Sequence, residues 1–104
     1  MTAYRGEIWL INLNPIRPAL VLQNNELNSG NYPTTIILPL TTSLINDAEP
    51  LRYRVLKREK LDQDSDILIA NIRAIDNVRF IEKLTSLTKK ELLYVKNLLD
   101  EVIS

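Results

Sequence analysis

The apolar pattern of this chain changes period once, and that change fixes the order of its elements. Before residue 88 the apolar residues form short runs bounded by Asn, Gly and Pro, a pattern typical of strands and turns. From Thr88 onward they recur at helical spacing, as Leu92, Val95, Leu99 and Val102. Thr88 and Glu91 form a capping-box signature. The sequence therefore predicts a β-rich unit over about residues 5–87 and an amphipathic C-terminal helix over about 88–103.

Five segments carry the strand pattern, and the last is long enough for two short strands. They are residues 7–14, 18–25, 34–40, 51–55 and 66–75. In 51–55, apolar residues alternate with Arg52 and Arg54, as in a half-buried antiparallel strand. Segment 25–33 is rich in Asn and contains Gly and Pro, which predicts a mobile hairpin loop. We expect a single domain spanning 1–104, mainly β, built as a small, strongly curved sheet or barrel.

The composition removes several kinds of chemistry. Among the 104 residues there is no cysteine, so disulfides, thiolate nucleophiles and thiolate metal sites are absent. Histidine is also absent, which removes the commonest general acid-base group. Because 13 basic residues balance 13 acidic ones, any nucleic-acid site has to be a local patch. No segment resembles a signal peptide or a membrane span, so we expect a cytoplasmic protein.

No familiar catalytic or metal-binding motif occurs in the sequence. The acidic segment 62–66, "DQDSD", looks like a metal-binding loop, but it lacks the central Gly and the distal Glu of an EF-hand. We interpret this segment as a solvated turn. The sequence predicts neither a metal ion nor another cofactor.

Arg17 lies in a rigid part of the chain, between Pro15 and Pro18. Each proline fixes its own φ and disfavours the helical conformation for the residue before it, so the backbone around Arg17 is restrained. The simplest interpretation is a strand connection whose arginine points into water. The alternative is a guanidinium aimed in advance at a ligand such as a phosphate.

Two other groups of polar residues lie near the ends of predicted strands. Thr41 and Thr42 follow an apolar strand, where their hydroxyls can reach beyond its rim, and Asn71 and Arg73 share one strand face. Separately, each has a structural explanation, since Thr favours strands and Arg73 can pair with an aspartate. Together with Arg17, they supply the guanidinium, hydroxyl and amide groups that a site for single-stranded nucleic acid needs.

Five motifs in order resemble the MazF/PemK/Kid family of toxin endoribonucleases from toxin-antitoxin pairs. They read "RGEIWLINLNP", "RPALVLQNN", "IILPLT", "DSDILIANIRAID" and "EKLTSL", and they extend over nearly the whole chain. The resemblance implies an SH3-like barrel with a C-terminal helix, like that of the related CcdB/PemK proteins, and a symmetric homodimer. It also implies sequence-selective cleavage of single-stranded RNA, such as mRNA, in a groove across the dimer. A cognate antitoxin with a flexible, acidic tail is expected to occupy the same groove.

The resemblance also implies which residues act. The catalytic arginine of the R-P motif corresponds to Arg17, and the catalytic threonine corresponds to Thr41, because this choice keeps the distance to Pro50 ungapped. In such enzymes the 2′-hydroxyl of the RNA attacks the adjacent phosphorus without a metal, leaving a 2′,3′-cyclic phosphate and a 5′-hydroxyl. Arg17 would hold the phosphate and Thr41 would donate a hydrogen bond to it. The further residues expected to contact RNA are Thr42, Asn24, Asn71, Arg73 and Asp76.

The sequence departs from the family pattern at two places. Family members usually have roughly ten residues between the N-P and R-P motifs, whereas Ile16 alone separates Pro15 from Arg17 here. Either the connection is short, or the printed sequence lacks a loop of roughly eight residues; a poor hairpin geometry favours the second account. Ala70 and Asn71 replace an acidic residue and Gln, so the recognised RNA sequence is expected to differ. For Arg73 and Asp76 a structural ion pair near the dimer seam is an alternative role.

Two other functions are compatible with this fold. A CcdB-like toxin would bind a protein target, gyrase, and would arrest growth with intact mRNA but damaged DNA. A weakened homologue would mainly titrate the antitoxin, binding it tightly without cleaving RNA. The R-P arginine and the strand-end threonine favour the endoribonuclease over both.

Overall fold

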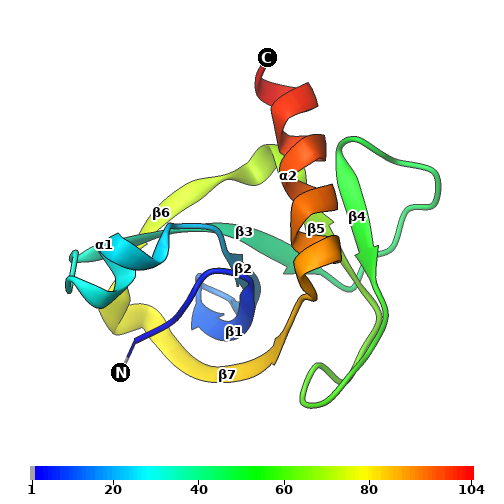
Figure 1. The fold of residues 1–104 in the computed structure, drawn as a ribbon. Coiled ribbons are helices and arrows are strands. Elements are labelled where there is room, and N and C mark those ends of the chain that lie inside the picture. The colour runs from blue at the N-terminus through cyan, green and yellow to red at the C-terminus, as the bar shows by residue number, and fades with distance from the viewer. Residues whose placement is uncertain (1) are drawn as a thin grey trace.

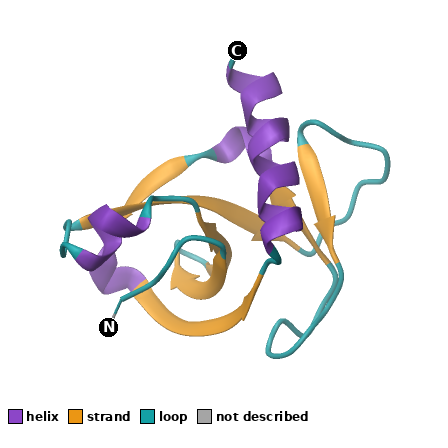
Figure 2. Cartoon of the chain, viewed as in Figure 1, coloured by secondary structure: helices purple, strands orange, loops and turns teal. Residues whose placement is uncertain are grey.

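The strands of this computed structural model form one antiparallel, seven-stranded sheet. The structure describes residues 2–104. Its elements are β1 (Glu7–Asn12), β2 (Ile16–Val21), α1 (Asn25–Ser29), β3 (Thr34–Thr41), β4 (Arg52–Val55), β5 (Ser65–Leu68), η1 (Ile69–Asn71), β6 (Arg73–Asp76), η2 (Asn77–Arg79), β7 (Phe80–Ser86) and α2 (Lys89–Ile103) (Figure 1). The strand order is β4-β5-β3-β2-β1-β7, and β6 pairs with the first half of β3. Long loops precede and follow β4 (Figure 2). The predicted class, mainly β with a C-terminal helix, is confirmed.

The two faces of the sheet bury separate apolar clusters, because successive residues of a strand point to opposite sides. In β1, Ile8 belongs to one cluster and Trp9 to the other. The first cluster includes Val95 and Leu98 of α2, which therefore packs on that face. In the second cluster the ring of Phe80 meets Trp9 edge-on, with ring centroids 5.6 Å apart. Burial on both faces explains why the central strands read as continuous apolar runs.

Helix α2 begins where the sequence predicts. The Thr88 hydroxyl accepts a hydrogen bond from the Glu91 backbone at 3.1 Å, and the Glu91 carboxylate accepts one from the Thr88 backbone at 2.9 Å, so the capping box is confirmed. Arg58 adds two hydrogen bonds to Glu91, at 2.7 and 2.9 Å, and thereby ties the loop after β4 to the helix start. Neither helix in the described chain has both the length and the apolar content needed to cross a membrane.

The prediction of a mobile hairpin loop over 25–33 is wrong, because this segment contains α1. Asn24 caps the helix by accepting a hydrogen bond from the Leu27 backbone at 2.9 Å. Gln23 and Asn28 are buried, and the Gln23 amide donates to the Asn28 side chain at 3.1 Å. The Asn-rich composition therefore supplies a helix cap and a buried amide pair as well as turns.

Two further expectations need correction. Strand β7 was not predicted, because its exposed middle reads as polar; it is held by pairing with β1 along the chain from Glu7 to Ile11. Residue 66 belongs both to the predicted turn 62–66 and to the predicted strand 66–75. The structure places Asp66 in β5, where it is 1% exposed, so the strand prediction is confirmed there and the solvated turn is wrong. Its carboxylate accepts hydrogen bonds from Arg54 at 2.5 Å and from Arg52 at 3.2 Å. The two arginines that alternate along β4 therefore compensate a buried charge.

Candidate active site

The connection between β1 and β2 closes with a short turn. The two strands remain paired up to Asn12 opposite Ile16, so only Leu13, Asn14 and Pro15 form the link. Asn14 has a φ of 52°, in the left-handed region that Asn tolerates better than most residues. Its backbone N–H donates to the Asn12 side chain at 3.2 Å. As the sequence stands, β1 and β2 therefore pair across a three-residue link.

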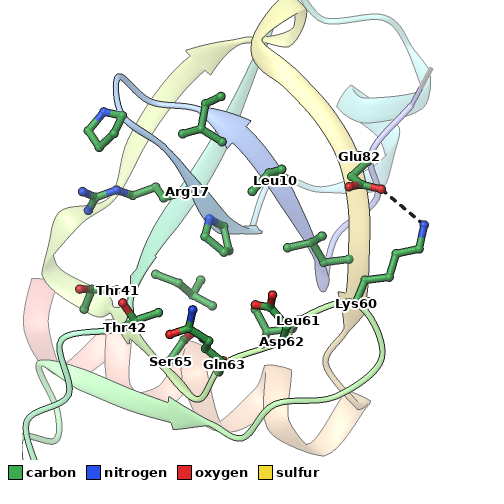
Figure 3. A pocket seen from close by; sticks show the side chains of 15 residues that line it. Leu10, Arg17, Thr41, Thr42, Lys60, Leu61, Asp62, Gln63, Ser65 and Glu82 are labelled. Atoms are coloured by element: carbon green, nitrogen blue, oxygen red, sulfur yellow. Dashed lines mark hydrogen bonds and ion pairs between the residues drawn. The ribbon is translucent and has the colours of Figure 1, made fainter.

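The prolines separate the ends of β2 and β3. The last pair of this ladder is Ala19 opposite Pro39, and neither Pro18 nor Pro39 has a backbone N–H to donate beyond it. Continued by two residues, the same register puts Arg17 opposite Thr41. Both side chains line a cavity of about 440 Å³ that opens where the strands part (Figure 3). The structure thus brings together the two residues predicted to be catalytic.

The guanidinium of Arg17 is available to a ligand. Arg17 is half-buried, yet its side chain forms no hydrogen bond or ion pair with any residue from 2 to 104. A planar guanidinium offers several N–H donors in a geometry that matches two phosphate oxygens. Held in a strand between two prolines, this group loses little conformational freedom when it binds an anion.

Thr41 is fixed at the end of β3. The Ser43 backbone donates to the Thr41 hydroxyl oxygen at 3.1 Å, which leaves the hydroxyl hydrogen free to be donated to a ligand. In the register of β3 and β5, Thr41 lies opposite Asp66. Besides the two arginines, the Ile45 backbone donates to the Asp66 carboxylate at 3.0 Å. Thr42 follows on the same rim, exposed, and lines the same cavity.

The charge state of Asp66 is set by its partners. Burial raises the pKa of this carboxyl, but the hydrogen bonds from Arg54, from the Ile45 backbone and from Arg52 lower it by more, so the pKa is below its usual value. Asp66 is therefore ionised at neutral pH and its two arginines are occupied. Arg52 and Arg54 thus have an acidic partner, whereas Arg17 has none among residues 2–104.

A second cavity, of about 260 Å³, shares Arg17 with the first. Asn71, at the end of η1, and Arg73, at the start of β6, line it together with Pro15 and Arg17, which belong to both cavities. Arg17 therefore lines both the cavity that contains Thr41 (the Thr41 cavity) and the cavity that contains Asn71 (the Asn71 cavity). A ligand bound to its guanidinium can extend into both.

Two of the predicted contact residues lie elsewhere. Asn24 is the cap of α1, and Asp76 ends β6 opposite Thr34; neither lines either cavity. Within the described residues, neither Arg73 nor Asp76 forms an ion pair with another residue.

Part of the larger cavity was not anticipated from the sequence. Lys60, Asp62 and Gln63 of the loop after β4, and Glu82 of β7, line its far end. The loop shows no strand or helix period, and β7 itself was not predicted. A signal was nevertheless present, because Asp62 and Gln63 are polar residues with no role in a predicted element.

Comparison with known proteins shows the family to which the chain belongs. Residues 4–103 match the family model described as PemK-like, MazF-like toxin of type II toxin-antitoxin system. The chain is 37% identical to an endoribonuclease MazF of Staphylococcus epidermidis, over 92% of this chain and 87% of that protein. It is 38% identical to an endoribonuclease MazF of Staphylococcus saprophyticus subsp. saprophyticus, with the same coverage. The chain therefore belongs to the PemK-like, MazF-like toxins of type II toxin-antitoxin systems.

A solved structure shows the same fold. It is described as an endoribonuclease in complex with its cognate antitoxin from a mycobacterial species, and it superposes with a TM-score of 0.82 at 18% identity, over 97% of this chain and 94% of that one. The alignment with the S. epidermidis protein spans 106 positions but only 92% of the 104 residues here, so about ten positions face no residue of this chain. That number is close to the roughly eight residues by which the link between the N-P and R-P motifs is shorter here than the family pattern.

Proposed function

We propose that this protein is a toxin endoribonuclease that cleaves single-stranded RNA, such as mRNA, without a metal ion. The observation that carries the proposal is that Arg17, which has no side-chain partner among residues 2–104, and Thr41 line one cavity. Membership of the toxin family and the names of the staphylococcal relatives support it. Both lines of support favour an endoribonuclease over a CcdB-like toxin that binds gyrase.

The reaction uses the nucleophile of the RNA itself. The 2′-oxygen forms a bond to phosphorus and releases its proton, while the bond from phosphorus to the 5′-oxygen breaks and that oxygen gains a proton. The products are a 2′,3′-cyclic phosphate and a 5′-hydroxyl. Arg17 holds the phosphate through its N–H donors, and the Thr41 hydroxyl donates to the same group. As negative charge builds up on the phosphoryl oxygens, these donors stabilise it.

The two cavities beside Arg17 suit an unpaired strand. With one phosphate at Arg17, one neighbouring nucleoside lies toward the Thr41 cavity and Thr42, and the other toward Asn71 and Arg73. Bases can enter such cavities only when they are unstacked, which favours single-stranded over double-stranded RNA. Asn24 and Asp76 would meet RNA only outside these two cavities.

The partners follow from the same proposal. We expect a homodimer, and a cognate antitoxin whose acidic tail covers the Thr41 cavity and blocks RNA. The mycobacterial endoribonuclease of the same fold is described as bound to its cognate antitoxin, which supports this expectation. A toxin that acts on mRNA also fits the predicted cytoplasmic location.

The test is cleavage of single-stranded RNA in the presence of EDTA, with mapping of the product ends. We expect 5′-hydroxyl and 2′,3′-cyclic phosphate ends. The rate should fall by about two to three orders of magnitude in Arg17→Ala and by about two in Thr41→Val, because each removes one donor. Lys96→Ala, which removes an exposed cation of α2 outside both cavities, is the control. Loss of cleavage with EDTA, or full activity of Arg17→Ala, contradicts the mechanism; tight antitoxin binding without cleavage indicates a titrating homologue.

A further inference from the structure

The Thr41 cavity continues well beyond the proposed catalytic pair. Figure 3 shows Thr41 and Thr42 at one end, then Gln63 and Asp62, and finally Lys60 and Glu82 at the other end. The walls between these polar groups are apolar, formed in part by Leu10, Leu61 and Leu84. At about 440 Å³, the cavity lies within the range of sites that bind small organic groups.

The loop that carries Asp62 and Gln63 is fixed before any ligand binds. Arg58 and Leu61 exchange two backbone hydrogen bonds, at 3.0 and 2.9 Å. The Lys60 backbone donates to the Leu84 carbonyl of β7 at 3.2 Å, and the buried Ser65 hydroxyl donates to the Gln63 carbonyl at 3.0 Å. A ligand that meets this loop therefore loses little affinity to ordering it.

The Asp62 and Gln63 side chains are free to meet a ligand. Neither side chain has a hydrogen-bond or ion-pair partner among residues 2–104, whereas Lys60 is paired with Glu82 at 3.4 Å. The far end of the cavity thus presents the carboxylates of Asp62 and Glu82 against one lysine. A phosphate is repelled there and attracted to Arg17, so the sugar-phosphate backbone belongs at the Arg17 end.

We infer that this cavity binds the base next to the cleaved phosphate, and that Asp62 and Gln63 select a base with an exocyclic amino group and reject uracil. The inference rests on the proposed function, since it deepens the account of the same substrate. The carboxylate of Asp62 accepts a hydrogen bond from an amino group, and the Gln63 amide can both donate and accept. The apolar walls contact the faces of the ring. Uracil has no exocyclic amino group, and its N3–H donor is flanked by two carbonyl oxygens. A carboxylate that accepts from N3–H therefore also meets these acceptors, which makes uracil the poorer ligand.

The test compares cleavage rates of matched RNAs. Sequencing of the 5′-hydroxyl ends from a transcript pool first locates the cut. Two sets of four synthetic single-stranded RNAs are then compared. The first set varies only the nucleotide on the 5′ side of the cut, and the second varies only the nucleotide on the 3′ side. At one of these positions we expect the best amino-bearing base to be cleaved at least about tenfold faster than uracil. Asp62→Asn and Gln63→Ala should each reduce that ratio at least about threefold while leaving the ratio at the other position unchanged.

The ratio between substrates separates base selection from a general loss of activity, which would slow all four RNAs alike. Asp100→Asn, the same change at an exposed position of α2, is the control and should keep the wild-type ratios. The inference is overturned if RNAs with uracil beside the cut are cleaved as fast as those with amino-bearing bases at both positions. It is also overturned if Asp62→Asn and Gln63→Ala both keep the wild-type rate ratios. In either case the proposed function stands. Absence of any RNA cleavage by the wild-type protein refutes the proposed function and this inference together.

Discussion

The arginines of β4 and the arginine of β2 occupy contrasting environments. Arg52 and Arg54 both donate to the buried carboxylate of Asp66, whereas Arg17 has no acidic partner within the described chain. A buried carboxylate that lost its cations would be costly, so the β4 pair serves the fold. Arg17 contributes no such contact, and its half-buried guanidinium faces a cavity. Unpaired and preorganised cations are the ones a protein can use on a ligand, and each prediction below tests this division of roles.

The largest effect is expected at Arg17. Arg17→Ala should lower the cleavage rate about 100- to 1000-fold, as removal of a preorganised donor does in other enzymes. The midpoint of thermal unfolding should hardly change, because Arg17 has no partner to lose within residues 2–104. Measuring the cleavage rate and the thermal unfolding midpoint on the same preparation checks both parts of this prediction. A clear loss of stability in Arg17→Ala would show that Arg17, like Arg52 and Arg54, stabilises the fold, and would contradict the division of roles.

Asp66 should show the opposite behaviour. Asp66→Ala leaves two guanidinium groups and the Ile45 backbone N–H without their shared acceptor, and we expect a loss of about 2–3 kcal/mol in the free energy of unfolding. Both arginines can still reach water, which keeps the loss at this level. Denaturant titration measures it, with Asp100→Asn as the exposed control. An unfolding free energy equal to that of the wild-type protein would show that the buried pair carries no stability.

Glu91 separates the capping box from the ion pair. Glu91→Gln keeps a residue that can cap Thr88 but removes the charge that Arg58 binds, and should cost about 0.5–1 kcal/mol. Glu91→Ala removes both and should cost about 1–2 kcal/mol. The difference between the two variants in denaturant midpoint measures the cap alone. Identical losses would mean that only the ion pair matters.

The smallest effect is a pH dependence of stability. Hydrogen bonds from Arg58 lower the pKa of Glu91, burial partly opposes them, and the Thr88 backbone lowers the pKa further; the pKa of Asp66 is lowered as well. A carboxyl with a lowered pKa in the folded state contributes stability above its unfolded pKa, about 4 for these groups, and loses it as the pH falls through the folded value. The denaturant concentration at the unfolding midpoint should therefore decrease as the pH is lowered below about 4. Asp66→Ala should make this decline less steep. An equally steep decline in the variant would show that Asp66 does not contribute to the pH dependence.

Local signals in the sequence were enough for much of the fold. The capping box at Thr88 and the helical spacing after it identify α2, and β-branched and apolar runs identify β1 to β6 within a few residues. Strand β7 was missed because its exposed residues Glu82 and Lys83 hide the strand period, and only pairing with β1 makes it a strand. The burial of Asp66 was also not predicted, because the two arginines that compensate its charge lie on another strand, β4.

The candidate site divides in the same way. Arg17 and Thr41 could be proposed because their motifs resemble a known family, and both line one cavity in the structure. Asp62 and Gln63 gave no motif, because a loop held by tertiary hydrogen bonds carries them to the cavity. Sequence reasoning therefore located the end of the site built on paired strands and missed the end built on a loop.

The most direct test of the central claim uses an RNA with a single 2′-deoxynucleotide on the 5′ side of the cleaved bond. If Arg17 and Thr41 stabilise a phosphate under attack by its own neighbouring hydroxyl, this RNA stays intact while the all-ribose RNA is cut in EDTA. Cleavage of both RNAs at the same bond would show that an external nucleophile attacks, and would contradict the account.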